Sequence, residues 1–116
     1  MADFLVDTDV FVAHLRGARA LRPATDSVSY SVITRCELFA GANDQEDAVR
    51  LVLSPFRELT IDREIAETAG SIRRTTGIRT PDALIAATAL THGLTLVTRN
   101  RRDFERVPRL RLRAPR

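Results

Sequence analysis

Two aspartates, Asp7 and Asp9, are separated by a single residue and directly follow the apolar run Phe4-Leu5-Val6. A short apolar run of this kind predicts a buried strand, and the ligands of α/β proteins gather where such strands end. Asp7 could instead cap the helix that follows, but Thr8 or Asp9 can take that position equally well. We therefore expect the Asp7 carboxylate to point into a ligand-binding crevice at the end of the first strand.

Two further acids lie on predicted helices. Glu37 has apolar neighbours at the i−4, i−1 and i+3 positions, which places its carboxylate at the edge of a buried stripe. An acid in that position needs either an arginine partner or a cation, and both remain open. Asp82 follows Thr80-Pro81 at the start of an apolar helix, where the helix dipole stabilises an anion. The same position would also hold a carboxylate rigidly as a cation ligand.

The segment from Thr98 to Phe104 supplies two more oxygen ligands, Asn100 and Asp103, behind another predicted strand. Hard oxygen ligands favour Mg²⁺ or Mn²⁺ over zinc, and gathered carboxylates repel one another unless a cation lies between them. Such a site on a basic protein is suited to phosphodiester hydrolysis, in which one or two ions activate a water and stabilise the leaving oxygen. We therefore expect these acids to converge on a divalent cation.

Strands and helices alternate in the elements that must position these acids, which is typical of a parallel sheet in a layered α/β fold. We expect strands at residues 4–6, 27–30, 59–61, 94–97 and 110–112. We expect helices at 8–16, 32–40, 45–53, 65–74 and 81–92, with Ser31, Asp62 and Thr80 as N-caps and Gly17, Gly41, Gly77 and Gly93 as stop signals. The last of these helices is apolar nearly all round, so it should be buried.

The chain has 116 residues, which predicts one domain over residues 1–116 with a sizeable core. Its single cysteine, Cys36, excludes an internal disulfide and a cysteine-based zinc site, and we expect it in the core. The start of the chain does not resemble a signal peptide, and no apolar run approaches the roughly 20 residues that span a bilayer. These features predict a cytoplasmic protein.

The basic residues give a net charge of +3, and apart from two histidines they are all arginine. GC-rich coding explains such a bias, although guanidinium groups also suit the geometry of phosphate. Arginines crowd residues 99–102 and 106–116. This charge is either a nucleic-acid footprint or a solvated terminus.

Four segments along the chain together resemble the motifs of PIN-domain ribonucleases, in particular the VapC toxins of VapBC toxin–antitoxin systems. They are LVDTDV at residues 5–10, the helix over 31–41 with CELFAG, TPDALIAATAL at 80–90 and LVTRNRRDFERV at 96–107. The resemblance implies a three-layer α/β/α sandwich with a central, mostly parallel sheet. It also implies Mg²⁺- or Mn²⁺-dependent cleavage of RNA, a homodimer, and inhibition by a VapB-like antitoxin that docks over the active-site groove.

By motif match, Asp7, Glu37 and Asp82 take the first three acidic positions of the family. The fourth falls in the loop with Asn100, where many members have aspartate, and Asp103 lies three residues on, so either side chain could be the ligand. Asp9 also differs from the asparagine that many relatives carry, and could add charge to the site or cap the helix.

The expected catalytic acids are therefore Asp7, Glu37, Asp82 and Asp103, and the expected metal ligands are the same four together with Asn100. The expected substrate contacts are hydrogen bonds from Thr8 and Thr98 and phosphate contacts from Arg99, Arg101 and Arg102.

Four other functions fit parts of the pattern. Phosphatases of the haloacid-dehalogenase type and receiver domains also place an aspartate at a strand end, but they use a lysine to balance the acyl-phosphate charge and this chain has none. A non-catalytic binding module would leave the acids facing phosphate without a cation, which only repels. A free-standing RNA-processing nuclease of the PIN type is the alternative to a toxin within the family.

Overall fold

A computed structural model describes residues 3–15 and 28–115 of the chain. The five strands are β1 (Phe4–Val6), β2 (Val28–Ser31), β3 (Arg57–Leu59), β4 (Thr95–Val97) and β5 (Leu112–Arg113). The six helices are α1 (Thr8–Leu15), α2 (Val32–Ala40), α3 (Glu46–Leu53), α4 (Arg63–Thr76), α5 (Thr80–His92) and α6 (Arg101–Phe104). The alternating strands and helices that the sequence predicted are confirmed.

The strands form one sheet in the order β3-β2-β1-β4-β5, and every neighbouring pair is parallel. From the central strand β1 the chain first moves outward to β2 and β3, and then returns to place β4 on the other side of β1. Phe4 pairs with Val28 on one side and Thr95 on the other. The order of the strands therefore reverses between β1 and β4, and in α/β sheets this switch point is where ligands bind.

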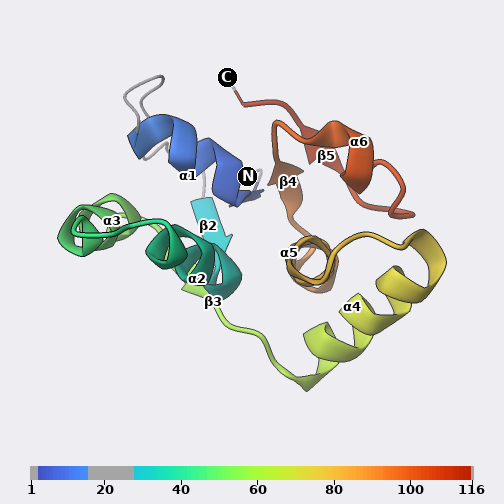
Figure 1. Cartoon of the computed structure of the whole chain (residues 1–116). Helices are drawn as coiled ribbons and strands as arrows, with labels where there is room; N and C mark the ends of the chain where they lie inside the picture. The colour runs from blue at the N-terminus through green and yellow to red at the C-terminus, as the bar shows by residue number, and fades with distance from the viewer. Residues whose placement is uncertain (1–2, 16–27, 116) are drawn as a thin grey trace.

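Helices cover both faces of the sheet, so the fold is the predicted three-layer α/β/α sandwich (Figure 1). Leu5 and Leu96 point to the face that packs against α4 and α5, while Val6 and Tyr30 point to the face that packs against α1, α2 and α3. This alternation along β1 follows from the period of two in a strand. Both faces are buried, as parallel sheets require.

Most helix ends lie where their capping residues predict them. Ser31 accepts a hydrogen bond from the Ile33 amide at the start of α2, and Asp62 accepts one from the Ile65 amide at the start of α4. The expected cap Thr80 is wrong, because α5 begins at Thr80 and Arg79 occupies the N-cap position without a side-chain hydrogen bond. Gly17 lies outside the described residues.

Both edge strands differ in position from the prediction, and one short helix was not predicted. The third strand was expected at 59–61 but lies at Arg57–Leu59, where Glu58 pairs with Tyr30. Only Leu59 of this edge strand is buried, so an apolar pattern could not mark its start. The fifth strand is likewise displaced, from 110–112 to Leu112–Arg113, and α6 was missed.

Among the described residues, no helix combines the length and apolar character needed to cross a bilayer.

Candidate active site

Asp7 lies at the switch point of the sheet, directly after β1, with only 5% of its surface exposed. Its backbone amide donates to the Val97 carbonyl oxygen at 2.9 Å, which fixes it beside the end of β4. Its Oδ1 accepts a hydrogen bond from the Thr8 amide at 2.8 Å, and its Oδ2 accepts one from the Thr98 hydroxyl at 2.8 Å. The carboxylate is therefore held by groups that directly follow the two central strands, at the strand end where the sequence placed it.

The charge on Asp7 is poorly stabilised by its surroundings. Burial raises the pKa of Asp7 to about 7, against the hydrogen bonds from Thr98 and Thr8, which lower it. The negative charges of Asp9 and Asp82 raise it further. A cation placed among these carboxylates would oppose all of the effects that raise the pKa.

Glu37 is half-buried on α2 and reaches the same region through Thr8. The Thr8 hydroxyl donates to Glu37 Oε1 at 2.7 Å, and it also lies 2.9 Å from the Thr34 hydroxyl. The structure gives Glu37 no ion pair with any arginine among the described residues, so the arginine alternative is not supported there. The expected buried stripe is displaced by one position, because the inward residues of α2 are Thr34 and Leu38.

Cys36 is exposed, and its expected place in the core is therefore wrong. Positions i and i+4 of a helix share a face, and once Thr34 and Leu38 face inward, residue 36 must point away. Glu37 then lies at the border of the buried face, within reach of α1.

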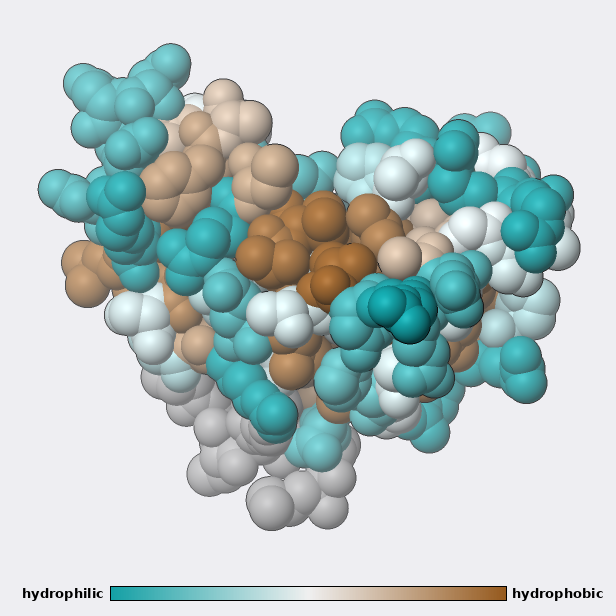
Figure 2. All heavy atoms as spheres, turned by 90° about the horizontal axis from the view of Figure 1, so that it is seen from below, coloured by the Kyte–Doolittle hydropathy of each residue, from teal (hydrophilic) through white to brown (hydrophobic). Residues whose placement is uncertain are grey.

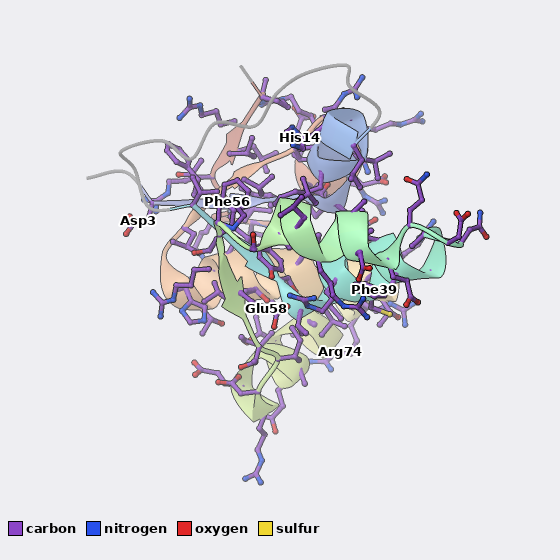
Figure 3. The ribbon with its side chains drawn as sticks, turned by 90° about the vertical axis from the view of Figure 1, so that its left-hand side faces the viewer. Asp3, His14, Phe39, Phe56, Glu58 and Arg74 are labelled. Carbon is purple, nitrogen blue, oxygen red and sulfur yellow. The ribbon has the colours of Figure 1, made fainter. Side chains whose placement is uncertain are left out.

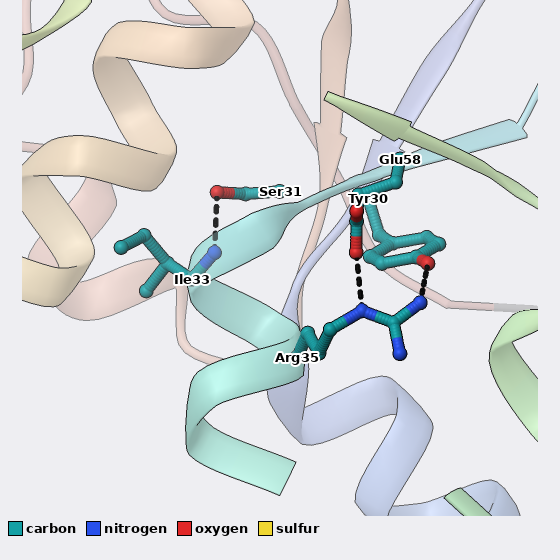
Figure 4. Close-up of polar contacts among 5 residues, drawn as sticks. All are labelled: Tyr30, Ser31, Ile33, Arg35 and Glu58. Atoms are coloured by element: carbon teal, nitrogen blue, oxygen red, sulfur yellow. Dashed lines mark hydrogen bonds and ion pairs between the residues drawn. The ribbon is translucent and has the colours of Figure 1, made fainter. Parts of the chain in front are cut away.

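The orientation of α2 is fixed by polar contacts at its start (Figure 4). The Arg35 Nε donates to Glu58 of β3 at 2.5 Å, and another Arg35 nitrogen donates to the Tyr30 hydroxyl at 3.0 Å. Together with the Ser31 cap, these contacts join the first turn of α2 to β2 and β3. Because helix rotation is fixed in this way, the direction in which Glu37 points is set as well.

Asp82 is half-buried in the first turn of α5, as predicted. Burial raises its pKa, and the nearby Arg79 guanidinium lowers it. The charges of Glu37, Asp103 and Asp9 also raise the pKa of Asp82. Acids from three other segments of the chain therefore influence the Asp82 carboxylate.

The segment after β4 carries the remaining candidates. The Asn100 side-chain amide donates to Asp103 Oδ2 at 3.1 Å, and the Asn100 backbone amide donates to the Thr98 hydroxyl oxygen at 2.9 Å. Asn100 is thus hydrogen-bonded to both Asp103 and Thr98, and Thr98 in turn holds Asp7. The candidates for the fourth position therefore lie side by side rather than apart.

The expected phosphate-binding arginines differ in their contacts. Arg101 forms an ion pair with Glu105 at 3.2 Å, one turn along the chain. Arg99 and Arg102 are exposed, and the structure gives neither side chain an ion pair within the described ranges. The hydroxyl protons of Thr8 and Thr98 are donated to acids of the site, so direct contact of these threonines with a substrate stays a prediction.

The side chains at this edge of the sheet fit a hydrated divalent ion. One oxygen of Asp9, Oδ1, is buried without a hydrogen-bond partner in the described part of the molecule, and a bound cation or one of its waters would satisfy it. The donors are hard oxygens, which suit Mg²⁺ or Mn²⁺. Among residues 3–15 and 28–115, no group of three or more acidic, histidine or cysteine side chains lies close enough together to hold a metal ion by direct contacts alone. An ion that keeps several of its waters does not need such a group.

Sequence reasoning missed two residues near these acids. Thr34 is fully buried and hydrogen-bonds to Thr8, a position that its i−3 spacing from Glu37 could have suggested. Arg79 lies beside Asp82 and lowers its pKa. Arg79 precedes Asp82 by three positions at the start of the same helix, so the same spacing could have suggested it.

Residues 4–110 match the PIN domain family. The chain is 33% identical over 119 residues to ribonuclease VapC19 of Mycobacterium tuberculosis, covering 91% of this chain and 95% of the relative. It is 37% identical over 108 residues to ribonuclease VapC10 of the same organism, covering 83% and 81%. A toxin–antitoxin complex from Klebsiella pneumoniae superimposes with a TM-score of 0.79 at 35% identity, over 93% of each chain. The family match includes both central strands and every acidic segment, and the two relatives exceed 30% identity over most of the chain. The chain therefore belongs to the PIN-domain family, within its VapC ribonuclease branch.

Proposed function

We propose that this protein is a Mg²⁺- or Mn²⁺-dependent endoribonuclease and the toxin of a VapBC-type toxin–antitoxin module. The observation that carries the proposal is the buried Asp7 carboxylate at the switch point, held by Thr98 and the Thr8 amide while the charges of Asp9 and Asp82 bear on it. A carboxylate in this position destabilises the ion-free protein, so a role in cation binding accounts for its presence. The VapC relatives supply the substrate class, RNA.

Asp7, Glu37, Asp82 and Asp103 are the acids that would hold the ion. Asp7 and Glu37 each have one hydroxyl bonded to them, which leaves lone pairs on both carboxylates for a cation. The Asp82 side chain has no hydrogen bond to any described residue, so both of its oxygens are available. A bound divalent ion would supply Lewis acidity, lowering the pKa of a water at the scissile phosphate and neutralising charge there.

Asp103 is the better candidate for the fourth position, and Asn100 orients it. The Asn100 amide nitrogen donates to Asp103 Oδ2, and this bond leaves Asp103 Oδ1 available to a cation. The charge of Asp103 raises the pKa of Asp82, which supports a place for Asp103 near that acid. The hydroxyl protons of Thr8 and Thr98 are already donated to Glu37 and Asp7, so these threonines would orient those two carboxylates and not bind the substrate directly.

Arg99, Arg101 and Arg102 follow the end of β4 and would bind the RNA backbone beside these acids. Arg99 and Arg102 are exposed. Arg101 would have to leave Glu105, a surface pair that contributes little, to reach a phosphate. Because cellular RNA is found in the cytoplasm, we propose that the protein acts there.

A VapB-like antitoxin and a second copy of the chain are the proposed protein partners, and apolar surface for them is present. Figure 3 looks onto the layer with α3 in front and α1 above it. A groove of about 380 Å³ lies there, lined in part by Leu15, Leu51 and Phe56, and Leu51 is 74% exposed. On another view, apolar side chains gather in the middle of a face ringed by hydrophilic ones (Figure 2). Exposed apolar surface of this kind is typical of protein–protein contact.

Cleavage of total RNA by the purified chain tests the proposed activity. We expect cleavage with Mg²⁺ or Mn²⁺ and none with excess EDTA. Asp82→Asn should lower the rate by more than about 10-fold, because even residues that only support a metal ligand typically contribute that much. Asp44→Asn, at an exposed position before α3, is the control and should cleave like the unaltered chain. Equal cleavage with EDTA, or by Asp82→Asn, would contradict the proposal.

A further inference from the structure

Two threonine hydroxyls and one carboxylate form a directed chain of hydrogen bonds between α1 and α2. The Thr8 hydroxyl donates to Glu37 Oε1 at 2.7 Å, and Thr8 Oγ1 lies 2.9 Å from Thr34 Oγ1. A hydroxyl has only one proton. Since Thr8 donates its proton to Glu37, the proton in the second bond must come from Thr34. The order is therefore Thr34 to Thr8 to Glu37.

Thr34 lies in the first turn of α2, so no carbonyl of its own helix lies four residues before it. Buried threonines further along a helix ordinarily donate to that carbonyl. Thr88 on α5 does this with the Leu84 carbonyl at 2.7 Å, and Thr76 on α4 does it with the Ile72 carbonyl at 2.7 Å. Thr34 is as fully buried as Thr88, both at 0% exposed, and its hydroxyl bonds instead to the Thr8 hydroxyl on another helix. That partner contacts a candidate metal ligand.

The backbone that carries Thr34 has little freedom to move. Ser31 caps the helix and Arg35 ties it to Glu58 and Tyr30 (Figure 4). Thr34 lies three positions before Glu37 on α2, so the two side chains lie on the same side of the helix, and both contact the Thr8 hydroxyl. The hydrogen bond from Thr34 therefore fixes the direction of the Thr8 O–H bond, which could otherwise rotate.

We propose that Thr34 is a positioning residue that directs the Thr8 proton to Glu37 Oε1, and so leaves the other Glu37 oxygen available to hold the divalent ion. This inference rests on the proposed function, in which Glu37 holds the ion. Partners that orient metal ligands typically contribute 10–100-fold to metal affinity. Thr8 contacts Glu37 directly and should lie in that range, and Thr34 acts one bond further away.

Binding of Mn²⁺ to the whole chain, measured by titration calorimetry and by the electron paramagnetic resonance of free Mn²⁺, tests this role without RNA. Thr34→Val keeps the shape of the side chain and removes its hydroxyl, and should weaken Mn²⁺ binding by about 3–10-fold. Thr34→Ser keeps the donor and should bind Mn²⁺ like the unaltered chain. Thr88→Val is the matched control, because it removes an equally buried hydroxyl that bonds only within its own helix.

A double-mutant cycle separates positioning from a general structural effect. In the Thr8→Val background, Thr34→Val should cause no further loss of Mn²⁺ affinity, because the hydroxyl that Thr34 directs is already absent. An equal loss in both backgrounds, or a loss in Thr34→Val no larger than in Thr88→Val, would overturn the role of Thr34. Failure of the proposed function has a different signature, which is Mn²⁺ binding by the unaltered chain without cleavage of RNA.

Discussion

At the scale of a residue, Asp7 shows that a buried acid suited to binding a cation destabilises the folded protein when the cation is absent. Burial raises its pKa to about 7, so at neutral pH the folded chain either keeps a proton on Asp7 or bears an ionised carboxylate inside the crevice. Asp9 and Asp82, whose pKa values are also raised by burial, compound the effect. Stability and function therefore oppose each other here, as is common at functional sites.

The pH dependence of stability follows from the sign of this shift. The pKa of Asp7 is higher in the folded state than the unfolded value of 3.8, so between these values the folded chain binds the extra proton. The contribution of Asp7 to stability is full below about pH 4 and is lost as the pH rises to about 7. In EDTA, Asp7→Asn should therefore raise the free energy of unfolding at pH 8 by on the order of 1–3 kcal/mol, and much less at pH 4.

Urea denaturation at both pH values measures this gain, with Asp44→Asn as the exposed control. Added Mn²⁺ should stabilise the unaltered chain at pH 8 and have little effect on Asp7→Asn. If Asp7→Asn were less stable than the unaltered chain at pH 8 in EDTA, the Asp7 carboxylate would not destabilise the ion-free protein as we infer.

At the scale of the element, two glycines end α4 and α5, the packed pair of helices of which α5 carries Asp82. Gly77 follows α4 with a φ of 74°, and Gly93 follows α5 with a φ of 66°. A Cβ at Gly77 would meet only the end of Arg106, at 3.8 Å, and at Gly93 it would meet nothing within 4 Å. Any cost of a side chain at these positions therefore comes from the left-handed backbone and not from a clash.

Alanine at either position should lower the free energy of unfolding by about 1 kcal/mol, since a left-handed residue other than glycine costs about 1–2 kcal/mol. Gly41 ends α2 with a φ of −101°, which any residue adopts, and Gly41→Ala should leave stability unchanged or raise it by up to about 1 kcal/mol. Thermal and urea unfolding of the three variants compares them directly. A Gly41→Ala variant as unstable as Gly77→Ala would show that backbone conformation does not set the cost.

The elements also show what the sequence could predict and what it could not. Local signals sufficed for β1, the Ser31 cap and the glycine stops, because a buried run, a side-chain cap and a left-handed residue each act within a few residues. The edge strand β3 was misplaced because only one of its residues is buried. The register of α2 was misjudged by one position, because Arg35 and Thr34 fix it through partners on β3 and α1. Contacts between distant segments leave no local pattern.

At the scale of the whole molecule, negative and positive charge are placed close together on a chain with a net charge of +3. The acids gather where β1 and β4 end, and the arginines that follow β4 start one residue beyond Thr98. An RNA strand would thus meet guanidinium groups beside the carboxylates that we propose as ligands of the ion. In that arrangement the arginines would bring phosphate to a region that would otherwise repel it.

Salt dependence of RNA binding tests this arrangement. Each phosphate contact on a single strand contributes about 0.7 to the slope of log affinity against log salt concentration, because binding releases counterions. Arg102 is exposed on α6, so Arg102→Gln should reduce the slope by about 0.7. The control, Arg57→Gln, alters an exposed arginine at the start of β3, on the opposite edge of the sheet, and should leave the slope unchanged.

The measurement is fluorescence anisotropy of a labelled single-stranded RNA between 50 and 200 mM salt, on the order of the range over which such contacts weaken strongly. All chains would carry Asp82→Asn so that the RNA stays intact. Equal slopes for Arg102→Gln and Arg57→Gln would mean that the positive charge acts over the whole surface and not beside the acids. A smaller slope for Arg102→Gln alone would place the RNA backbone along α6, within reach of Asp103 on the same helix.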